Sequence, residues 1–212
     1  MCNRYQQAAM QEAKEALAAI IETPFNMGSD LVHPQSPGLV VRQDKGQRIL
    51  ASMTWGFPLI LADAKARAAA KGVAVKPKPV NNTRTDKLGS GFWNRWTGPA
   101  HRCLIPVKGY AEAVGIKGSM TEAWMTVPGQ TVFAVAGIWR PSVEWGDCYS
   151  MIMTDAGGDA ATVHTRMPVV LSPADQTRWL EQPMPDALAL CQPWHGPLIV
   201  NRTEQLWARK LR

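Results

Sequence analysis

Apolar positions near the start of the chain recur with the period of a helix. The segment QAAMQEAKEALAAII, residues 7–21, is rich in strong helix formers, and its apolar side chains fall on one face. That face holds Met10, Ala13, Leu17, Ile20 and Ile21. The segment LILADAKARAAAK, residues 59–71, has a similar composition and stops at Gly72. We therefore predict helices over 7–21 and 59–71.

Short apolar runs bounded by Gly and Pro dominate the middle of the chain. LVV at 39–41 and ILASMTW at 49–55 are typical of strands. Between 102 and 153 the runs are RCLIPV, GYAEAV, AWMTV, VFAVAGIW and CYSMIM. Turn residues separate these runs, which indicates a mostly antiparallel sheet.

A third helix is predicted at SPADQTRWL, residues 172–180. Ser172 suits the N-cap, Pro173 the first helical position and Asp175 the first turn. The chain has 212 residues and no internal repeat. We predict an α+β fold, a mostly antiparallel sheet core flanked by helices, in a single domain spanning 1–212.

Net charge favours a polyanionic partner. The chain carries 23 Lys and Arg against 17 Asp and Glu, a formal charge of +6. Residues 71–87 concentrate five basic side chains against Asp86 alone, and the C-terminal WARKLR adds three more. A solvated basic loop and tail is the alternative interpretation of both stretches.

Cysteine spacing and hydropathy exclude several classes of protein. Cysteines at 2, 103, 148 and 191 form no CxxC and no zinc-finger spacing with the four histidines. Charged residues interrupt the first 25 positions, and no apolar run reaches membrane-spanning length. We expect no metal, no cofactor and no membrane partner, and a cytoplasmic monomer with reduced thiols that is nucleoid-associated when bound to DNA.

The position of Cys2 raises a chemical possibility. Loss of Met1 would leave Cys2 with an α-amine and a thiol on one residue. Such a pair reacts with aldehydes: the amine forms a Schiff base, and the thiol closes onto it as a thiazolidine. The alternative is a cysteine that merely falls near the start of the chain.

Further candidates stand in three short segments. PVNNTRTDKL holds Asn82 and Arg84, RCLIPVKGYAEAV holds Glu112, and TVHTRMPVVLSP holds His164 and Arg166. Each has a structural alternative. Asn82 suits a turn, Glu112 could face solvent, and a lone histidine such as His164 is often a satisfied core residue.

The order of these segments resembles the SRAP family of SOS-response-associated peptidases, the abasic-site crosslinking proteins. The matching pieces are MCNRY, MTWGF, NTRTDK, RCLIPVKGYAE and HTRMPVVLSP, spread from residue 2 to about 181. The resemblance implies a mixed α/β fold with a basic groove for single-stranded DNA. It further implies self-removal of Met1, a covalent link to abasic sites, and a lyase-like or self-reversing activity.

The resemblance also assigns roles to individual residues. Cys2 would supply the amine and thiol, and Asn82 would position Cys2 and the sugar. Glu112 would be a general acid/base with a pKa near neutrality, and His164 would bind the sugar hydroxyl and assist reversal. The residues that would clamp phosphates beside the lesion are Arg4, Arg84 and Arg166.

The chain departs from the family pattern at several positions. Asn3 and Ala113 stand where the family has Gly and Trp, and Phe57–Leu61 replaces a segment with Pro-x-Trp. The two absent tryptophans are candidates for stacking on DNA bases, worth about 1–3 kcal/mol per base. Trp93 and Trp96 are possible substitutes, whereas a core position is expected for the remaining tryptophans considered, Trp124, Trp139 and Trp179.

Two other functions remain open from the sequence. An N-terminal-nucleophile hydrolase would use the Cys2 thiolate against an amide. A non-catalytic module would bind single-stranded DNA whether or not a lesion is present.

Overall fold

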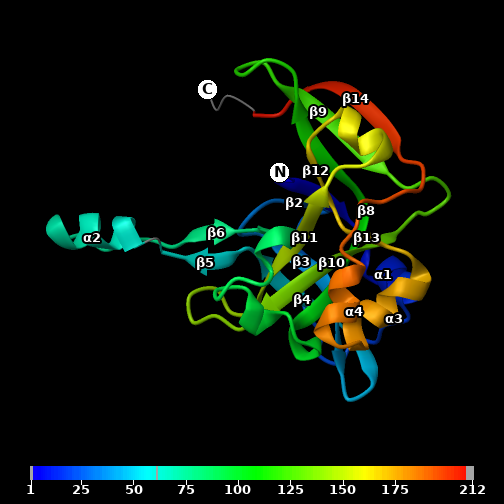
Figure 1. Ribbon diagram of the computed structural model, residues 1–212, viewed down its shortest axis with the longest axis horizontal. Helices are drawn as coiled ribbons and strands as arrows, with labels where there is room; N and C mark the ends of the chain where they lie inside the picture. Colours follow the sequence, from blue (N-terminus) through cyan, green and yellow to red (C-terminus); the bar gives the residue numbers. More distant parts are fainter. Residues whose placement is uncertain (1, 61, 209–212) are drawn as a thin grey trace.

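The computed structural model describes residues 2–60 and 62–208 and confirms the α+β prediction (Figure 1). The α-helices are α1 (Met10–Leu17), α2 (Ala62–Ala70), α3 (Pro173–Glu181) and α4 (Met184–Ala189). The strands are β1 (Arg4–Gln7), β2 (Leu31–Val32), β3 (Pro37–Asp44), β4 (Gln47–Trp55), β5 (Phe57–Leu59), β6 (Lys78–Val80), β7 (Asn82–Arg84), β8 (Arg102–Val114), β9 (Thr121–Thr126), β10 (Phe133–Arg140), β11 (Cys148–Asp155), β12 (Arg166–Pro168), β13 (Val170–Leu171) and β14 (Ile199–Leu206). Short 3-10 turns cover Thr85–Lys87, Asn94–Trp96, Pro99–His101 and Gly158–Thr162.

The central sheet closes into a ring. Strand β8 pairs with both β3 and β10, and the path β10–β11–β4–β3 joins those two strands on the other side. All of these pairings are antiparallel except β11 with β4, which is parallel. Closure removes the exposed edges that an open sheet would have.

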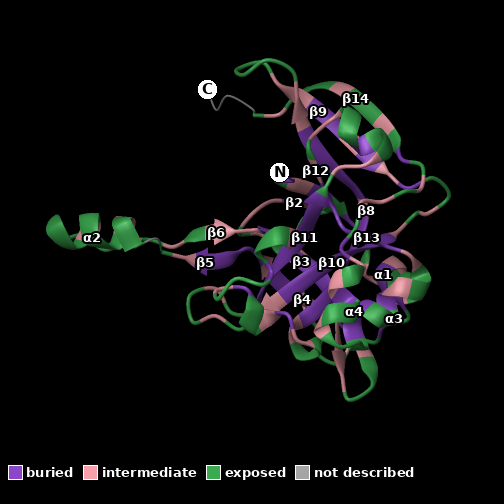
Figure 2. Ribbon diagram, in the orientation of Figure 1, coloured by how far each residue is buried: buried purple, intermediate pink, exposed green. Residues whose placement is uncertain are grey.

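Side chains alternate between the two faces of each ring strand, and the two faces belong to two separate buried clusters. In β8, Leu104 joins a cluster with Leu17 of α1 and Trp179 of α3, whereas Cys103 and Ile105 join the other. The helices therefore cover one face of the strands, and the opposite faces enclose a second core that no α-helix residue enters. Figure 2 shows this burial along β8, β10 and β11.

The second half of β8 runs past the ring and carries β1 on one edge and β9 on the other. Arg4 pairs with Ala111, and Ala111 pairs with Trp124. Strand β14 then adds to β9. This extension places the start of β1 beside Ala111, the neighbour of Glu112 in β8.

A two-stranded hairpin, β5 with β6, leaves the body and carries α2 at its end (Figure 1). It begins at Gly56, whose φ of +121° is one that residues with a side chain rarely adopt. A Cβ at this position would lie 2.7 Å from Cβ of Pro79. The glycine of the Trp-Gly motif is therefore required where the hairpin begins.

The structure corrects the predicted helix over 7–21, which is too long at both ends. Gln7 belongs to β1, because pairing with β8 overrides the helix propensity of the segment. The helix ends at Leu17, since Ala18 adopts a left-handed conformation with φ of 48°.

The predicted helix over 59–71 is also too long. Leu59 pairs with Lys78 in the β5–β6 hairpin, so the helix is confined to α2, and position 61 lies outside the described residues. The predicted strands at 39–41 and 49–55 are confirmed within β3 and β4. The predicted helix over 172–180 is confirmed as α3, with the Ser172 hydroxyl accepting a hydrogen bond from the Asp175 backbone N–H at 3.3 Å.

Candidate functional site around Cys2

Cys2 is fully buried at the N-terminal end of β1, in the cluster enclosed by the ring. Its thiol donates a hydrogen bond to the backbone oxygen of Arg4 at 3.3 Å. Burial, followed by the negative charge of Glu112, raises the pKa of this thiol far above its usual range. The sulfur is therefore held as a neutral thiol at neutral pH.

Two neighbouring asparagines hold the backbone of Cys2. The Nδ2 atoms of Asn82 and Asn81 donate to the Cys2 carbonyl oxygen at 2.5 and 3.1 Å. Trp55 helps to hold the two asparagines in place, because its indole N–H donates a hydrogen bond to the Asn81 carbonyl oxygen at 2.8 Å. The Trp-Gly motif thus supports the asparagines as well as the hairpin exit.

Glu112 lies on β8 with only 2% of its surface exposed. Burial raises its pKa to about 7, the near-neutral value expected from the sequence, whereas its catalytic role stays a prediction. A carboxyl group with this pKa is partly protonated near neutral pH and can move a proton in either direction.

His164 follows the 3-10 turn Gly158–Thr162. Its Nδ1 lies 2.9 Å from the Arg166 backbone N–H and 3.3 Å from the Arg166 carbonyl oxygen, so the backbone of Arg166 orients the ring. Burial is the main cause that lowers the pKa of His164, so the ring is neutral at pH 7.

Arg84 and Arg166 lie on strands that flank the same stretch of β11. Met153 of β11 pairs with Arg84 on one side and with Pro168 of β12 on the other. Arg84 forms a forked contact with Asp86 at 2.8 and 2.7 Å, and Arg166 approaches Asp155 at 3.2 Å.

Both of these aspartates are exposed, at 45% for Asp86 and 78% for Asp155. The hydrogen bond from Arg84, together with nearby charges that include Arg166, lowers the pKa of Asp86. Exposed ion pairs contribute little to stability, so phosphates can replace these carboxylates at small cost.

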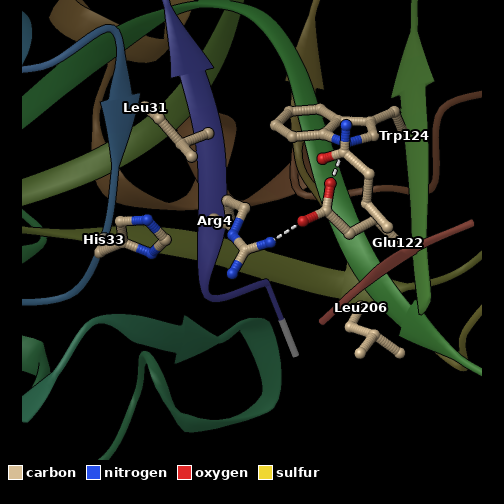
Figure 3. Close-up of a pocket in the computed structure, with 7 residues that line it drawn as sticks. Arg4, Leu31, His33, Glu122, Trp124 and Leu206 are labelled. Carbon is tan, nitrogen blue, oxygen red and sulfur yellow. Dashed lines mark hydrogen bonds and ion pairs between the residues drawn. The ribbon is translucent and has the colours of Figure 1, made fainter. Parts of the chain in front are cut away.

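The side chain of Arg4 is directed away from Glu112, although the Arg4 backbone oxygen accepts the hydrogen bond from Cys2. Because Arg4 pairs with Ala111 and side chains alternate, it lies on the opposite face of the β1–β8 pair from Glu112. There it forms an ion pair with the buried Glu122 and donates to the Trp207 carbonyl at 2.9 Å. Figure 3 shows Arg4 directed at Glu122.

Arg4 and Glu122 line a cavity of about 750 Å³, together with His33 and Trp124 among other residues. Arg4 therefore ties β1 to β9 and to the C-terminal segment. The phosphate contact expected of Arg4 stays a prediction.

The tryptophans only partly follow the prediction. Trp179 is buried, but Trp124 and Trp139 are half-buried rather than core residues. Trp93 is buried and packs on Phe57 with ring centroids 5.4 Å apart, and Trp96 packs edge-on against the same ring at 6.5 Å. Both residues therefore pack against Phe57 of the hairpin, and a role for them in stacking on DNA stays a prediction.

Sequence reasoning missed Asn81 and Glu122 as parts of the site and its support. The Asn-Asn doublet was a visible signal for Asn81, whereas Glu122 looks like an ordinary polar position in a strand. Among residues 2–60 and 62–208, no three His, Cys, Asp or Glu side chains gather closely enough to hold a metal ion. In the same part of the chain, no helix is long and apolar enough to cross a membrane.

The protein is thus of the class that has a closed, mostly antiparallel sheet and a buried cysteine just before its first strand. A sequence model of one family, described as SOS response associated peptidase (SRAP), matches residues 1–204. The chain belongs to the SRAP family.

Solved structures share the fold. A protein from Bordetella bronchiseptica is 22% identical with a TM-score of 0.73, covering 95% of this chain and 99% of its own. A phage-related protein from the same organism is 20% identical with a TM-score of 0.70, over 96% and 95% of the two chains. One from Bacteroides thetaiotaomicron is 16% identical with a TM-score of 0.72, over 95% and 91%. A search of curated proteins finds no significant match.

Proposed function

We propose that this protein links itself covalently to abasic sites in single-stranded DNA through the α-amine and thiol of Cys2. The family's description as a peptidase fits self-removal of Met1, which hydrolyses the Met1–Cys2 peptide bond and exposes that amine. The observation that carries the proposal is the placement of a buried Cys2 thiol beside Glu112, whose pKa is about 7.

The reaction balances with the groups present. Ring opening moves a proton from the anomeric hydroxyl of deoxyribose to the ring oxygen, and Glu112 is the group that carries protons in this step. The amine then adds to the aldehyde carbon, and loss of one water gives a Schiff base. Finally the thiol adds across the C=N bond: sulfur bonds to carbon, the thiol proton reaches nitrogen, and the thiazolidine is complete.

The state of the thiol favours this order of steps over thiolate chemistry. A cysteine hydrolase needs a thiolate, and reactive cysteines usually have a lowered pKa. The pKa of Cys2 is raised instead. The amine is therefore the first nucleophile, and the thiol acts only when a carbon atom is already held against it.

Asn82 fits a positioning role in this reaction. It is 93% buried, its Nδ2 holds the Cys2 carbonyl, and its Oδ1 accepts no hydrogen bond from any described residue. A buried acceptor without a donor is costly, and a sugar hydroxyl beside Cys2 would satisfy it.

Incubation with single-stranded DNA that carries one abasic site tests the proposal. We expect a shifted species that survives heat and denaturant, and none with undamaged DNA of the same sequence. Release of peptide products from unrelated substrates without any crosslink would instead favour the hydrolase. Salt-sensitive binding that ignores the lesion would favour the non-catalytic module.

Replacing His164 is expected to affect reversal more than formation. His164→Ala should form the crosslink only a few times more slowly, because the amine, thiol and Glu112 remain. Release should slow by a larger factor, since a neutral ring that can exchange a proton with the sugar is lost. A chase of labelled, preformed crosslink with excess unlabelled abasic DNA measures both rates. Release as fast as in the wild type would mean that His164 is structural.

The phosphate contacts should appear in the salt dependence of binding. Neutralising both arginines in Arg84→Gln/Arg166→Gln should reduce the slope of log K against log salt by about 1.4 for a single strand. The matched control is Arg42→Gln/Arg178→Gln, because each of these arginines also pairs with an aspartate, at 3.4 and 2.7 Å. Equal slopes for the two double variants would place the DNA path elsewhere.

A further inference from the structure

The β5–β6 hairpin and α2 form a basic arm, residues 57–80, that starts directly at the site. Its first strand follows Trp55 and Gly56, and its second strand ends immediately before Asn81 and Asn82. Those asparagines donate to the Cys2 carbonyl oxygen. Any strand of DNA held at Cys2 therefore passes the base of this arm.

The arm contributes little to the core. No residue of α2 is buried, and Figures 1 and 2 show the helix projecting from the body and exposed along its length. A nine-residue helix in water is marginal by length alone, and its alanines supply helix propensity rather than packing. Changes at its surface can therefore be made without loosening the body of the protein.

The charge on the arm is mostly positive. Asp63 is the only acidic residue between 57 and 80, and five exposed side chains are basic. These are Lys65, Arg67, Lys71, Lys76 and Lys78. Within residues 2–60 and 62–208, none of the five forms an ion pair.

We propose that the basic arm binds the phosphates of the single strand that leaves the abasic site, and so anchors the DNA by charge. This proposal rests on the proposed function, because that function identifies the bound strand as abasic DNA. A protein partner fits less well, since Ile60 and Val73 are the large apolar side chains that the described part of the arm exposes. In this chain the basic side chains of the arm contribute to DNA binding, whereas the two tryptophans of the family pattern are absent.

The test is the salt dependence of non-covalent binding to a long, undamaged, labelled oligothymidylate. The variant Lys65→Gln/Arg67→Gln/Lys71→Gln removes three charges from the arm with residues of similar helix propensity. The slope of log K against log salt should fall by about 2, at about 0.7 for each charge. The matched control Lys14→Gln/Lys45→Gln/Arg178→Gln removes three charges from α1, the β3–β4 turn and α3, and should keep the wild-type slope.

A second readout separates the arm from the covalent chemistry. On an abasic oligonucleotide too short to reach the arm, the arm variant should crosslink at the wild-type rate. If the wild type forms no crosslink, the proposed function fails, and the salt slopes still decide whether the arm binds DNA. Equal slopes for the arm variant and its control, a loss confined to duplex DNA, or slower crosslinking of the short oligonucleotide would each overturn the inference.

Discussion

Cys2→Ala should abolish the heat-stable crosslink to abasic single-stranded DNA. Once Met1 is removed, which intact-mass spectrometry of the variant checks, alanine carries the same α-amine, and only the sulfur is lost. Without sulfur the reaction stops at a Schiff base, which water hydrolyses. A denaturing gel of protein and labelled abasic DNA measures the loss, and a stable crosslink in this variant would contradict thiazolidine formation.

Cys2→Ser is the matched control for this result. The hydroxyl has nearly the shape of the thiol but is a weaker nucleophile toward the Schiff base. We expect at most a labile adduct that borohydride traps. Trapping in both variants would show that the amine reacts first and that sulfur provides the stability.

Glu112→Gln should slow crosslink formation by roughly 10²-fold, the low end of general acid–base contributions. Glutamine keeps the shape of the side chain but cannot exchange a proton during ring opening. Single-turnover rates on abasic DNA, with enzyme in excess, measure the effect. A wild-type rate in this variant would show that Glu112 transfers no proton in the rate-determining step.

The pH dependence of stability provides an independent check on Glu112. Its folded pKa of about 7 lies above the ordinary 4.5, so its favourable contribution is present below pH 4.5 and is lost as pH rises toward 7. At about 1.4 kcal/mol per pH unit, the ionised carboxylate costs about 3 kcal/mol at pH 8. Glu112→Gln should thus be more stable than the wild type at pH 8 and similar at pH 4, as measured by urea unfolding.

The motif segments could be placed from sequence because local pattern determines them. The runs RCLIPV and GYAEAV are strand as expected, but the turn predicted between them is wrong, because the chain continues through Lys108 and Gly109 as the single strand β8. The cap residues of SPADQTRWL start α3 where expected. In both cases the information lies within a few neighbouring residues.

Long-range pairing explains what the sequence could not predict. The face on which Arg4 lies depends on its register with Ala111, and a slip of one residue would turn Arg4 toward the Glu112 side. Gln7 has helical neighbours in sequence but strand neighbours in space. The pKa of Glu112 likewise comes from burial between distant strands, which no local pattern reveals.

Intact-mass spectrometry of the protein after reaction with an abasic oligonucleotide tests the central claim most directly. The account predicts a protein that lacks Met1, and an adduct whose mass is that of this protein plus the oligonucleotide, less one water. Protein that keeps Met1 and still forms the adduct, or protein that lacks Met1 and forms none, would contradict it.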